Sequence, residues 1–595
     1  MSDLSVRSWR KASDDMSLDT GDQKLSARQA GQPLETARTR LFVAGAIFAL
    51  CFAVLGGRLV QLSLLGGGQS QQRVAEQQGG ALTLQRADIV DRNGTLLATN
   101  LPSHSLYVNP SQVLDANEAA DKIISVLPGL TRADIFRKAS AKGQFAWIKR
   151  NLTPEQHYAV NRLGLPGFSF EREERRVYPH GALFVHTLGF TGVDNKGLAG
   201  LEAALDDDLK QLAATPGGKM VTALDSRVQH VVHAELSAAM IEFKAKGAAG
   251  IVIDVNSGEV LALTSLPDFS PYAPGSSKAN QRFNRATLGV YELGSTFKTF
   301  TTAMALEYDV VDMNDRYDAT KPLKVARFTI RDDHPQNRWL DVSEIMIHSS
   351  NIGAAQMARD VGAERQKEFL GRLGMLSPLP FELAENGRPL APRHWREINT
   401  MTIGFGHGIA VTPLHLISGF ATLINGGIKT TPTLLRNDAP QTEENGGERV
   451  IARETSDSMR TLMRMVVEQG TGKKAEAEGY LVGGKTGTAE KATVGGYKKN
   501  ALITTFVGAF PMDAPRYAVL VMLDEPHGNK ATHGYAGAGW NAAPVLGRIV
   551  SQIAPMLGVM PLLPSSTEDN NEDDNQDNTQ LLVRADGKGR HFASY

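Results

Sequence analysis

Cysteine is almost absent from this sequence. Its 595 residues include one cysteine, Cys51, so the chain cannot build an internal disulfide framework, a Cys-ligated zinc site or a redox pair. An excess of charge of either sign is also lacking, since 63 Lys and Arg stand against 64 Asp and Glu. Nucleic-acid binding domains usually carry a basic surface, and the balance argues against that class. We expect no metal and no cofactor.

Long apolar segments are lacking apart from one near the N-terminus. Residues 41–57 carry no charge, and the apolar run resumes after Arg58 and continues to residue 65. As a helix, residues 41–65 would measure roughly 37 Å, enough to cross a bilayer core of about 30 Å. A cleaved signal peptide is the alternative, but a long segment precedes the run and no convincing cleavage site follows it. We therefore predict an uncleaved transmembrane helix.

Basic residues flank this predicted helix unequally. Lys24, Arg28, Arg38 and Arg40 precede it closely, whereas residues 66–85 contain one basic residue. The positive-inside rule therefore predicts a single-pass membrane protein with its N-terminus in the cytoplasm and the chain beyond about residue 65 outside. In a bacterium the outside is the periplasm or the cell exterior. The first forty residues mix both charges without apolar periodicity, so we expect residues 1–40 to form a mobile cytoplasmic tail.

The chain beyond the anchor is long enough for at least two folded units. Residues 66–221 mix short strands and helices, with helices expected near 119–126 and 154–163 and a hairpin turn at Asn93-Gly94. They contain no set of residues that would form a catalytic site. We interpret them as a pedestal or interaction module.

The second unit is predicted to span residues 222–556 and to contain an antiparallel sheet with helices. The predicted elements are a helix at 225–244, a hairpin at 249–263, strands at 504–510 and 517–523, and a helix at 542–556. We expect residues 557–595 to form a C-terminal tail, acidic and disordered in part. The fold class expected is therefore α+β.

Three short motifs, far apart in the sequence, together describe an active-serine site. They are Ser295-Thr296-Phe297-Lys298, Ser349-Ser350-Asn351 and Lys485-Thr486-Gly487-Thr488. A serine hydroxyl is a poor nucleophile at neutral pH and needs a proton acceptor beside it. A lysine three residues later shares one side of the first helical turn with the serine. Burial and nearby positive charge would lower the pKa of that lysine and make it usable as a base.

The three motifs differ in how readily chance produces them. S-x-x-K is expected about two or three times in a chain of this length, and Ser8 and Lys11 form a second match in the N-terminal tail. Ser295 differs because Gly294 precedes it and apolar residues follow it with helical spacing. S-x-N more often caps a helix. K-T-G is scarcer. Gly483 and Gly484 precede it, and such glycines suit an edge strand that a substrate backbone can approach closely.

Two other features of the sequence suggest different chemistry. Residues 479–486 formally satisfy the G-x-x-x-x-G-K-T phosphate-loop pattern, but a helical pattern precedes them and no capped helix follows, contrary to what that loop requires. His407 suggests a Ser/His pair, but no acid is marked beside it. A lone histidine in a glycine-rich turn is more often structural, and we favour that reading.

The order S-x-x-K, S-x-N, K-T-G resembles the signature of penicillin-binding proteins and serine β-lactamases. The resemblance covers residues 41 to about 556, and residues 86–94, 176–179 and 291–295 look like segments of class B penicillin-binding proteins. Residues 348–353 and 406–413 are most similar to the division-specific, septal transpeptidases. The resemblance implies a pedestal followed by a penicillin-binding, β-lactamase-like transpeptidase domain.

The resemblance also implies a mechanism. Ser295 would attack the D-Ala-D-Ala peptide bond while Lys298 accepts its proton. Ser349, with Lys485 behind it, would relay a proton to the leaving amine, and Asn351 would orient the lysine and the donor amide. An amine from a neighbouring stem peptide would then resolve the acyl-enzyme into a cross-link.

Substrate binding is implied for the K-T-G strand. Thr486, Gly487 and Thr488 would hold the donor and its terminal carboxylate, and the backbone N–H groups of Ser295 and Thr488 would form the oxyanion hole. The implied partners are stem peptides on lipid-linked or nascent glycan, β-lactams, a membrane glycan polymerase and other division proteins.

Alternative functions remain open at this point. They are an elongation-specific transpeptidase, a β-lactam sensor or hydrolase, and a non-catalytic β-lactam-binding scaffold. A hydrolase would need a deacylating base, and the sequence marks none. A vestigial site would be expected to have lost part of a motif, whereas all three motifs are complete.

Overall fold

The computed structural model describes residues 46, 49–50, 52–54, 86–437, 439–493 and 496–562. The chain divides into two compact units, residues 1–83 and residues 84–595. In the part of the chain that the structure describes, no helix is both long and apolar enough to span a bilayer. The predicted cytoplasmic tail, most of the predicted anchor and the acidic C-terminal segment lie outside the described residues.

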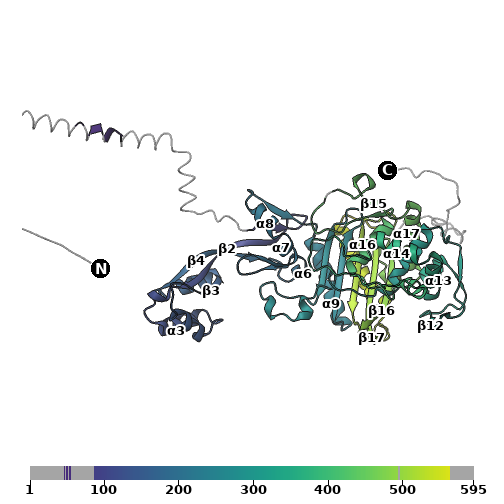
Figure 1. Ribbon diagram of the computed structural model, residues 1–595, viewed down its shortest axis with the longest axis horizontal. Helices are drawn as coiled ribbons and strands as arrows, with labels where there is room; N and C mark the ends of the chain where they lie inside the picture. The colour runs from purple at the N-terminus through teal and green to yellow at the C-terminus, as the bar shows by residue number, and fades with distance from the viewer. Residues whose placement is uncertain are drawn as a thin grey trace, which may run out of the picture. The chain divides into compact units, whose positions relative to one another are not determined.

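A five-stranded sheet organises the start of the second unit. Its strands are β1 (Asp88–Val90), β2 (Leu96–Val108), β3 (Ala146–Leu152), β4 (Phe168–Val177) and β7 (Lys219–Val221). They lie in the order β3-β2-β1-β7, and β4 pairs with β2 outside this path (Figure 1). The predicted turn is confirmed, because Gly94 has a φ of 85° and its N–H donates to Asp91 O over 3.0 Å between two antiparallel strands.

Three helices cover part of this sheet. They are α3 (Ala116–Val126), α4 (Arg132–Ala139) and α5 (Pro154–Asn161). Both predicted helices are confirmed, although the one at 154–163 ends two residues early. Asp115 caps α3 and Thr153 forms a capping box with α5, so polar side chains satisfy the first N–H groups of each helix. Leu106, Ile123 and Val160 belong to the small apolar core beneath the helices.

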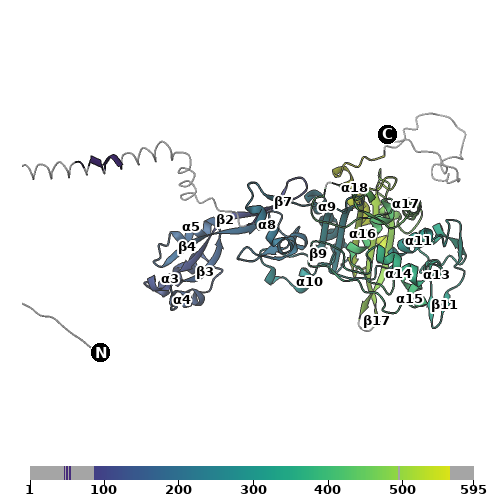
Figure 2. The ribbon, with the colours of Figure 1, turned by 45° about the horizontal axis from the view of Figure 1, so that its top comes forward.

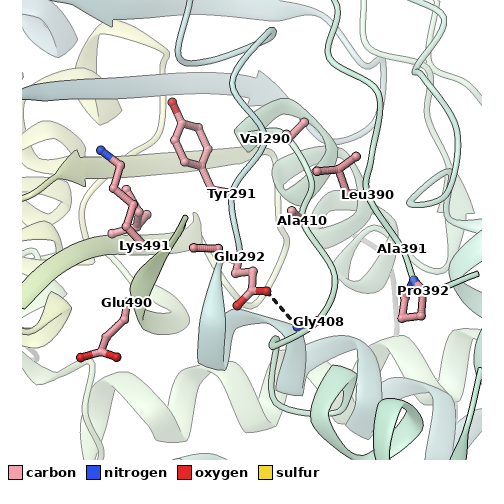
Figure 3. Close-up of a pocket in the computed structure, with 12 residues that line it drawn as sticks. Val290, Tyr291, Glu292, Leu390, Ala391, Pro392, Gly408, Ala410, Glu490 and Lys491 are labelled. Carbon is pink, nitrogen blue, oxygen red and sulfur yellow. Dashed lines mark hydrogen bonds between the residues drawn. The ribbon is translucent and has the colours of Figure 1, made fainter. Parts of the chain in front are cut away.

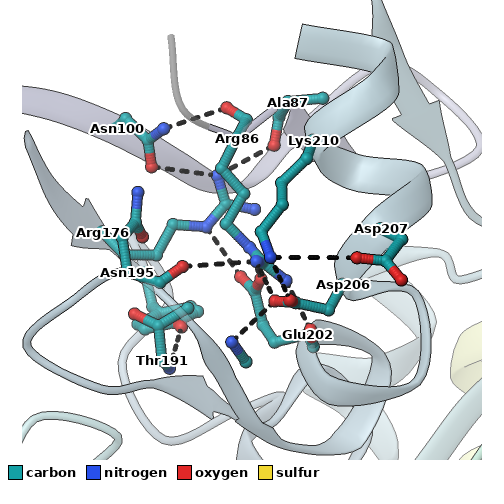
Figure 4. A network of polar contacts seen from close by, with 12 residues as sticks. Arg86, Ala87, Asn100, Arg176, Thr191, Asn195, Glu202, Asp206, Asp207 and Lys210 are labelled. Atoms are coloured by element: carbon teal, nitrogen blue, oxygen red, sulfur yellow. Dashed lines mark hydrogen bonds and ion pairs between the residues drawn. The ribbon is translucent and has the colours of Figure 1, made fainter.

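A buried network of charges joins Arg86, two residues before β1, to helices that follow 116 and 120 residues later (Figure 4). Arg86 Nε lies 2.5 Å from one carboxylate oxygen of Glu202, and Arg176 Nε lies 2.7 Å from the other. Arg86 also pairs with Asp206, and Arg176 donates to Ala87 O over 2.8 Å. Buried charges are tolerated when paired in this way. We assign the network a structural role.

Short elements complete this region. They are η1 (Pro110–Gln112), α6 (Val185–Leu188), β5 (Phe190–Thr191), β6 (Gly197–Ala199), α7 (Gly200–Ala204) and α8 (Asp206–Ala213).

A second five-stranded sheet, entirely antiparallel, forms the centre of the remaining fold. Its strands are β8 (Gly247–Asp254), β9 (Val260–Leu266), β16 (Gly483–Thr493), β17 (Gly496–Phe510) and β18 (Tyr517–Asp524), in the order β16-β17-β18-β8-β9. The predicted hairpin and the two predicted C-terminal strands are confirmed. The chain returns after more than 200 residues to place β18 beside β8, and β16 lies at an edge of the sheet.

Both faces of this sheet are covered by helices (Figures 1 and 2). On β18, Ala518, Leu520 and Met522 pack into one core, while the alternating Val519, Val521 and Leu523 pack into another. The second core contains α9 (Ser226–Glu242) and α18 (Ala542–Met556), which confirms both predicted helices. The continuous apolar run of the strand therefore follows from burial on both faces.

The other face carries the helices that contribute to the site. They are α11 (Lys298–Glu307), α12 (Val342–Ile347), α13 (Asn351–Val361), α14 (Ala363–Arg372), α15 (Glu397–Ile403), α16 (Pro413–Ile424) and α17 (Arg453–Glu468), with η3 (Gly294–Phe297) leading into α11. The smaller elements are η2 (Pro274–Ser276), α10 (Ala279–Arg282), β10 (Arg316–Asp318), β11 (Leu323–Val325), β12 (Phe328–Ile330), β13 (Trp339–Asp341), β14 (Ile428–Lys429), η4 (Glu443–Asn445), β15 (Glu448–Arg449), η5 (Lys473–Ala475) and η6 (Ala538–Trp540). An antiparallel sheet between helical layers confirms the α+β class.

Candidate active site

Ser295 and Lys298 meet where a 3₁₀ turn leads into α11. Ser295 lies on η3, and Lys298 is the first residue of α11. Lys298 Nζ donates to Ser295 Oγ over 2.9 Å. Gly294 has a φ of 55°, and a Cβ there would lie 2.7 Å from Thr488 O, so only glycine fits before the serine. The predicted pair of nucleophile and base is therefore brought together.

Burial controls the charge of Lys298. Its side chain is 0% exposed, and removal from water lowers its pKa from 10.5 to about 7. We expected nearby positive charge to contribute, but the charges acting on Lys298 are those of Asp332 and Asp333, which oppose the shift. Near neutral pH, a substantial fraction of this lysine is therefore the neutral amine, which can accept a proton.

The S-x-N motif occupies the corner between α12 and α13. Lys298 Nζ donates to Ser349 O over 2.5 Å, to Ser349 Oγ over 3.0 Å and to Asn351 Oδ1 over 2.7 Å. Ser349 has a φ of 58°, a left-handed conformation that costs a non-glycine residue about 1 kcal/mol. Strained residues of this kind gather at functional sites.

The capping role expected for an S-x-N motif is filled by its middle residue. Ser350 Oγ accepts from Gly353 N over 3.0 Å at the start of α13, and it donates to Asp332 Oδ2 over 2.8 Å. Asp332 also accepts from Ile352 N over 2.9 Å. Capping by Ser350 leaves Ser349 and Asn351, one on each side of it, turned towards Lys298.

Lys485 reaches the same corner from the edge strand β16. It is also 0% exposed, and its Nζ donates to Ser349 Oγ over 2.9 Å. Burial, and then the charge of Lys298, hold the pKa of Lys485 well below its usual range. Both lysines therefore contact one hydroxyl, which can accept a proton from one side and donate to the other.

The K-T-G strand rules out the phosphate-loop alternative. That loop requires a strand before it and a helix after it, whereas α17 precedes the motif and β16 contains it. Thr486 Oγ1 lies 2.7 Å from Thr471 Oγ1, and the exposed Thr488 accepts from Ala538 N over 3.1 Å. Both threonines also line the cavity next to Ser295.

The reason for Gly487 differs from the one expected. We expected the glycine to admit a substrate backbone, but a Cβ at Gly487 would lie 2.2 Å from Leu293 O and 2.8 Å from the side chain of Thr296. Its missing side chain makes room for the turn that carries the serine. The strand and the turn are thus packed backbone against backbone.

Two cavities meet at Ser295. One, of about 310 Å³, is lined by Ser349, Thr486 and two lysines, Lys473 and Lys474. The Nζ atom of Lys474 lies 3.6 Å from the ring centre of Trp540. The other, of about 760 Å³, is lined by Asn351, Glu490 and Tyr497 among others, and both cavities include Thr488. Within the described residues, no group of His, Cys, Asp or Glu side chains could hold a metal ion.

His407 lies nearer the serine than the sequence suggested. It lines the larger cavity with Ser295, and its ring contacts Phe405 and, at 5.9 Å between ring centres, Tyr497. Burial lowers the pKa of His407, so it is neutral at neutral pH. No hydrogen bond joins it to Ser295 in the described structure, so it forms no Ser/His pair.

Sequence reasoning missed Glu292, Asp332 and Tyr497 altogether. Tyr497 donates to Glu292 Oε2 over 2.9 Å, although the two residues are 205 positions apart. The β16-β17 hairpin brings Tyr497 to this position. Of these three residues, only Glu292 lies close to Ser295 in the sequence, three positions before it, so only Glu292 could have been suspected from its position.

Comparisons with known proteins agree with this geometry. The family profile "Penicillin binding protein transpeptidase domain" matches residues 248–550, and "Penicillin-binding Protein dimerisation domain" matches residues 82–226. The chain is 39% identical over 546 residues to the "Probable peptidoglycan D,D-transpeptidase FtsI" of Caulobacter vibrioides, which covers 90% of this chain and 91% of that protein.

Other relatives extend the same pattern. The "Probable peptidoglycan D,D-transpeptidase PenA" of Neisseria gonorrhoeae is 35% identical over 528 residues, covering 83% of this chain and 88% of that protein. The crystal structure of a peptidoglycan synthetase from Bifidobacterium adolescentis, 22% identical, shares the fold with a TM-score of 0.63 over 81% of this chain and 97% of that chain. With both family domains present in order and the serine, lysine and K-T-G elements assembled, the chain belongs to the class B penicillin-binding proteins and is a serine-type D,D-transpeptidase.

Proposed function

We propose that this enzyme cross-links peptidoglycan stem peptides at the division septum through an acyl-enzyme on Ser295, and that β-lactams acylate the same serine. The observation that carries the catalytic part is the buried Lys298 Nζ, 2.9 Å from Ser295 Oγ. The septal part rests on the resemblance of residues 348–353 and 406–413 to septal enzymes.

Acylation uses Lys298 as the base, and Lys485 holds the hydroxyl that relays the proton. Neutral Lys298 takes the proton of Ser295 as the oxygen attacks the carbonyl carbon of the D-Ala-D-Ala bond. Ser349 passes a proton to the leaving D-alanine amine and regains one from the Lys298 side, with Lys485 holding its hydroxyl. Asn351 accepts a hydrogen bond from Lys298 through Oδ1 and donates through Nδ2 to Arg331 O over 2.9 Å, which fixes the amide orientation.

Substrate is held along β16. Thr486 and Thr488 bind the terminal carboxylate, Gly487 keeps the strand against the serine turn, and the charges of Lys473 and Lys474 favour an anion on that side. The N–H groups of Ser295 and Thr488 form the oxyanion hole, where one donor is worth about 3 to 4 kcal/mol of the barrier.

Deacylation completes the cross-link. The nitrogen of an acceptor amine bonds to the acyl carbon, the ester bond to Ser295 Oγ breaks, and the proton lost by the amine returns to Ser295 through Lys298. When a β-lactam acylates Ser295, its ring nitrogen stays attached to the acyl group and no amine departs. The enzyme therefore remains acylated.

We place the molecule in the inner membrane with a cytoplasmic tail (1–40), an anchor (41–65), a pedestal (66–221), a transpeptidase domain (222–556) and a C-terminal tail (557–595). The anchor is supported by the residues described within it, which are helical and expose Leu50, Phe52 and Val54 to between 65% and 70%. The pedestal and the anchor would contact a membrane glycan polymerase and other division proteins.

Labelling with a fluorescent penicillin tests the acyl-enzyme. We expect the full-length protein to be labelled covalently, Ser295→Ala to abolish labelling with an unchanged melting temperature, and the control Ser125→Ala, on the exposed surface of α3, to be labelled normally. Labelling of Ser295→Ala would assign the nucleophile to another residue.

Localisation tests the septal role. A tagged copy should gather at midcell in dividing cells, and depletion should give filaments. Uniform labelling of the lateral wall, with loss of elongation on depletion, would instead support the elongation-specific alternative.

A further inference from the structure

We propose that Glu292 recognises an ammonium group at the end of an aliphatic side chain of the donor peptide. This inference rests on the proposed transpeptidation. Glu292 lies in a cavity of about 450 Å³ that contains none of the three motifs (Figure 3). It lies three residues before Ser295, so the loop that carries the nucleophile also carries this carboxylate.

The carboxylate of Glu292 is held by neutral donors. Gly408 N donates to Oε1 over 3.1 Å, and the Tyr497 hydroxyl donates to Oε2 over 2.9 Å. No Lys or Arg among the described residues forms an ion pair with Glu292, and burial lowers the pKa of nearby His407, so this histidine is not a permanent cation. The negative charge is therefore fixed in position and available to a ligand cation.

The walls of the cavity suit an aliphatic chain. Val290, Leu390, Pro392, Ala410 and Ile503 supply apolar surface around the single half-buried carboxylate. Figure 3 shows the Lys491 ammonium and the Glu490 carboxylate pointing in opposite directions, and Lys491 is already paired with Asp524 and Glu525. The exposed carboxylate of Glu490 lines the cavity as well, so its unpaired charges are both negative. A methylene chain that ends in an ammonium matches these apolar walls and the half-buried carboxylate of Glu292.

The cavity adjoins the one that contains the nucleophile. It shares Gly408 and Glu490 with the 760 Å³ cavity that contains Ser295, so a peptide seated beside Ser295 can extend a side chain to Glu292. An ammonium beside Glu292 would lie in the neighbouring cavity, outside the cavity where the acyl carbon is bonded to Ser295.

The bound cation is therefore not the attacking amine. In the proposed reaction every stem peptide that acts as an acceptor carries an amine, and the same peptide acting as a donor carries that amine unused. We assign the Glu292 cavity to this spare amine of the donor.

Two matched donors test the assignment in the full-length protein. Both are peptidyl-D-alanyl thioesters, one with a lysyl side chain that ends in a free ammonium and one in which that amine is acetylated. Thiol release in the presence of fixed enzyme gives kcat/KM for acylation. We expect Glu292→Gln, which retains an oxygen for Gly408 and Tyr497, to lower kcat/KM about tenfold for the free ammonium donor, the ratio for one charge-assisted hydrogen bond of about 1.4 kcal/mol.

The acetylated donor and the amine-free benzylpenicillin should acylate Glu292→Gln at the rate of the unsubstituted protein, and Glu292→Asp should restore part of the preference. Glu444→Gln, which alters an exposed carboxylate outside the cavities described, is the matched control for a lost charge and should change neither donor. An equal fall with both donors, no change with either, or a change confined to aminolysis by an added acceptor amine would each overturn the assignment. A wild-type chain that never acylates with either donor would refute the proposed transpeptidation as well.

Discussion

The rate at which a β-lactam acylates Ser295 should follow the deprotonation of Lys298. In the proposed mechanism the neutral lysine is the base, so the rate should rise with pH and level off above the pKa, which burial lowers to about 7. With that pKa, about 9% of the lysine is neutral at pH 6 and about 91% at pH 8, so the second-order rate constant should rise roughly tenfold over this interval. Stopped-flow measurements with a chromogenic cephalosporin provide the assay.

The refuting results are distinct. A lysine at its ordinary pKa of 10.5 would give a rate constant that continues to rise tenfold per pH unit beyond pH 8, and a flat profile would show that Lys298 is not the base. Asp333→Asn provides a signed control. Asp333 raises the pKa of Lys298, so its neutralisation should move the whole curve to lower pH and speed acylation at pH 6, which general structural damage would not do.

Two further predictions use matched pairs. Gly406→Ala should lower the acylation rate at least tenfold, because the added Cβ would lie 1.9 Å from Gly294 O in the serine turn. Gly426→Ala, at a similar φ with no atom within 4 Å of the added Cβ, should cost about 1 kcal/mol of stability and leave the acylation rate unchanged. Equal acylation rates for the two variants would contradict the packing argument. Ser350→Ala and Asp115→Ala each remove a helix N-cap, and each should lower the free energy of unfolding in denaturant by about 1 kcal/mol. Only Ser350→Ala should slow acylation. An equal loss of acylation rate in Asp115→Ala would disprove a local effect of the Ser350 cap.

Local signals in the sequence predicted much of this fold. The helix at 542–556 has the bounds of α18, and the hairpin at 249–263 is the β8-β9 pair. Periodicity and turn residues are sufficient there because the elements depend on neighbouring residues. The three motifs were predictable for a similar reason, since each consists of residues within four positions of one another in the sequence.

Long-range packing limited the remaining predictions. The pairing of β18 with β8 and the meeting of Tyr497 with Glu292 depend on contacts between residues more than 200 positions apart. Burial is equally non-local, which explains the mistaken sign for the charges around Lys298. The sequence showed Asp332 and Asp333 in a polar stretch, and only the fold places them close enough to raise the pKa of that lysine.

The hydroxyl of Ser349 lies between two buried lysines. Ser349 Oγ lies 3.0 Å from Lys298 Nζ and 2.9 Å from Lys485 Nζ, and water is excluded from both amines. Two adjacent buried ammonium groups would repel each other strongly, so the pair favours sharing a single positive charge. In the mechanism that we propose, Lys298 becomes positive as Ser295 is deprotonated, and its charge lowers the pKa of Lys485 and so favours the neutral amine that holds the Ser349 hydroxyl by a hydrogen bond. The hydroxyl between them can then shift its hydrogen bonds and deliver a proton to the leaving amine while the oxygen of Ser295 is still bonded to the acyl carbon.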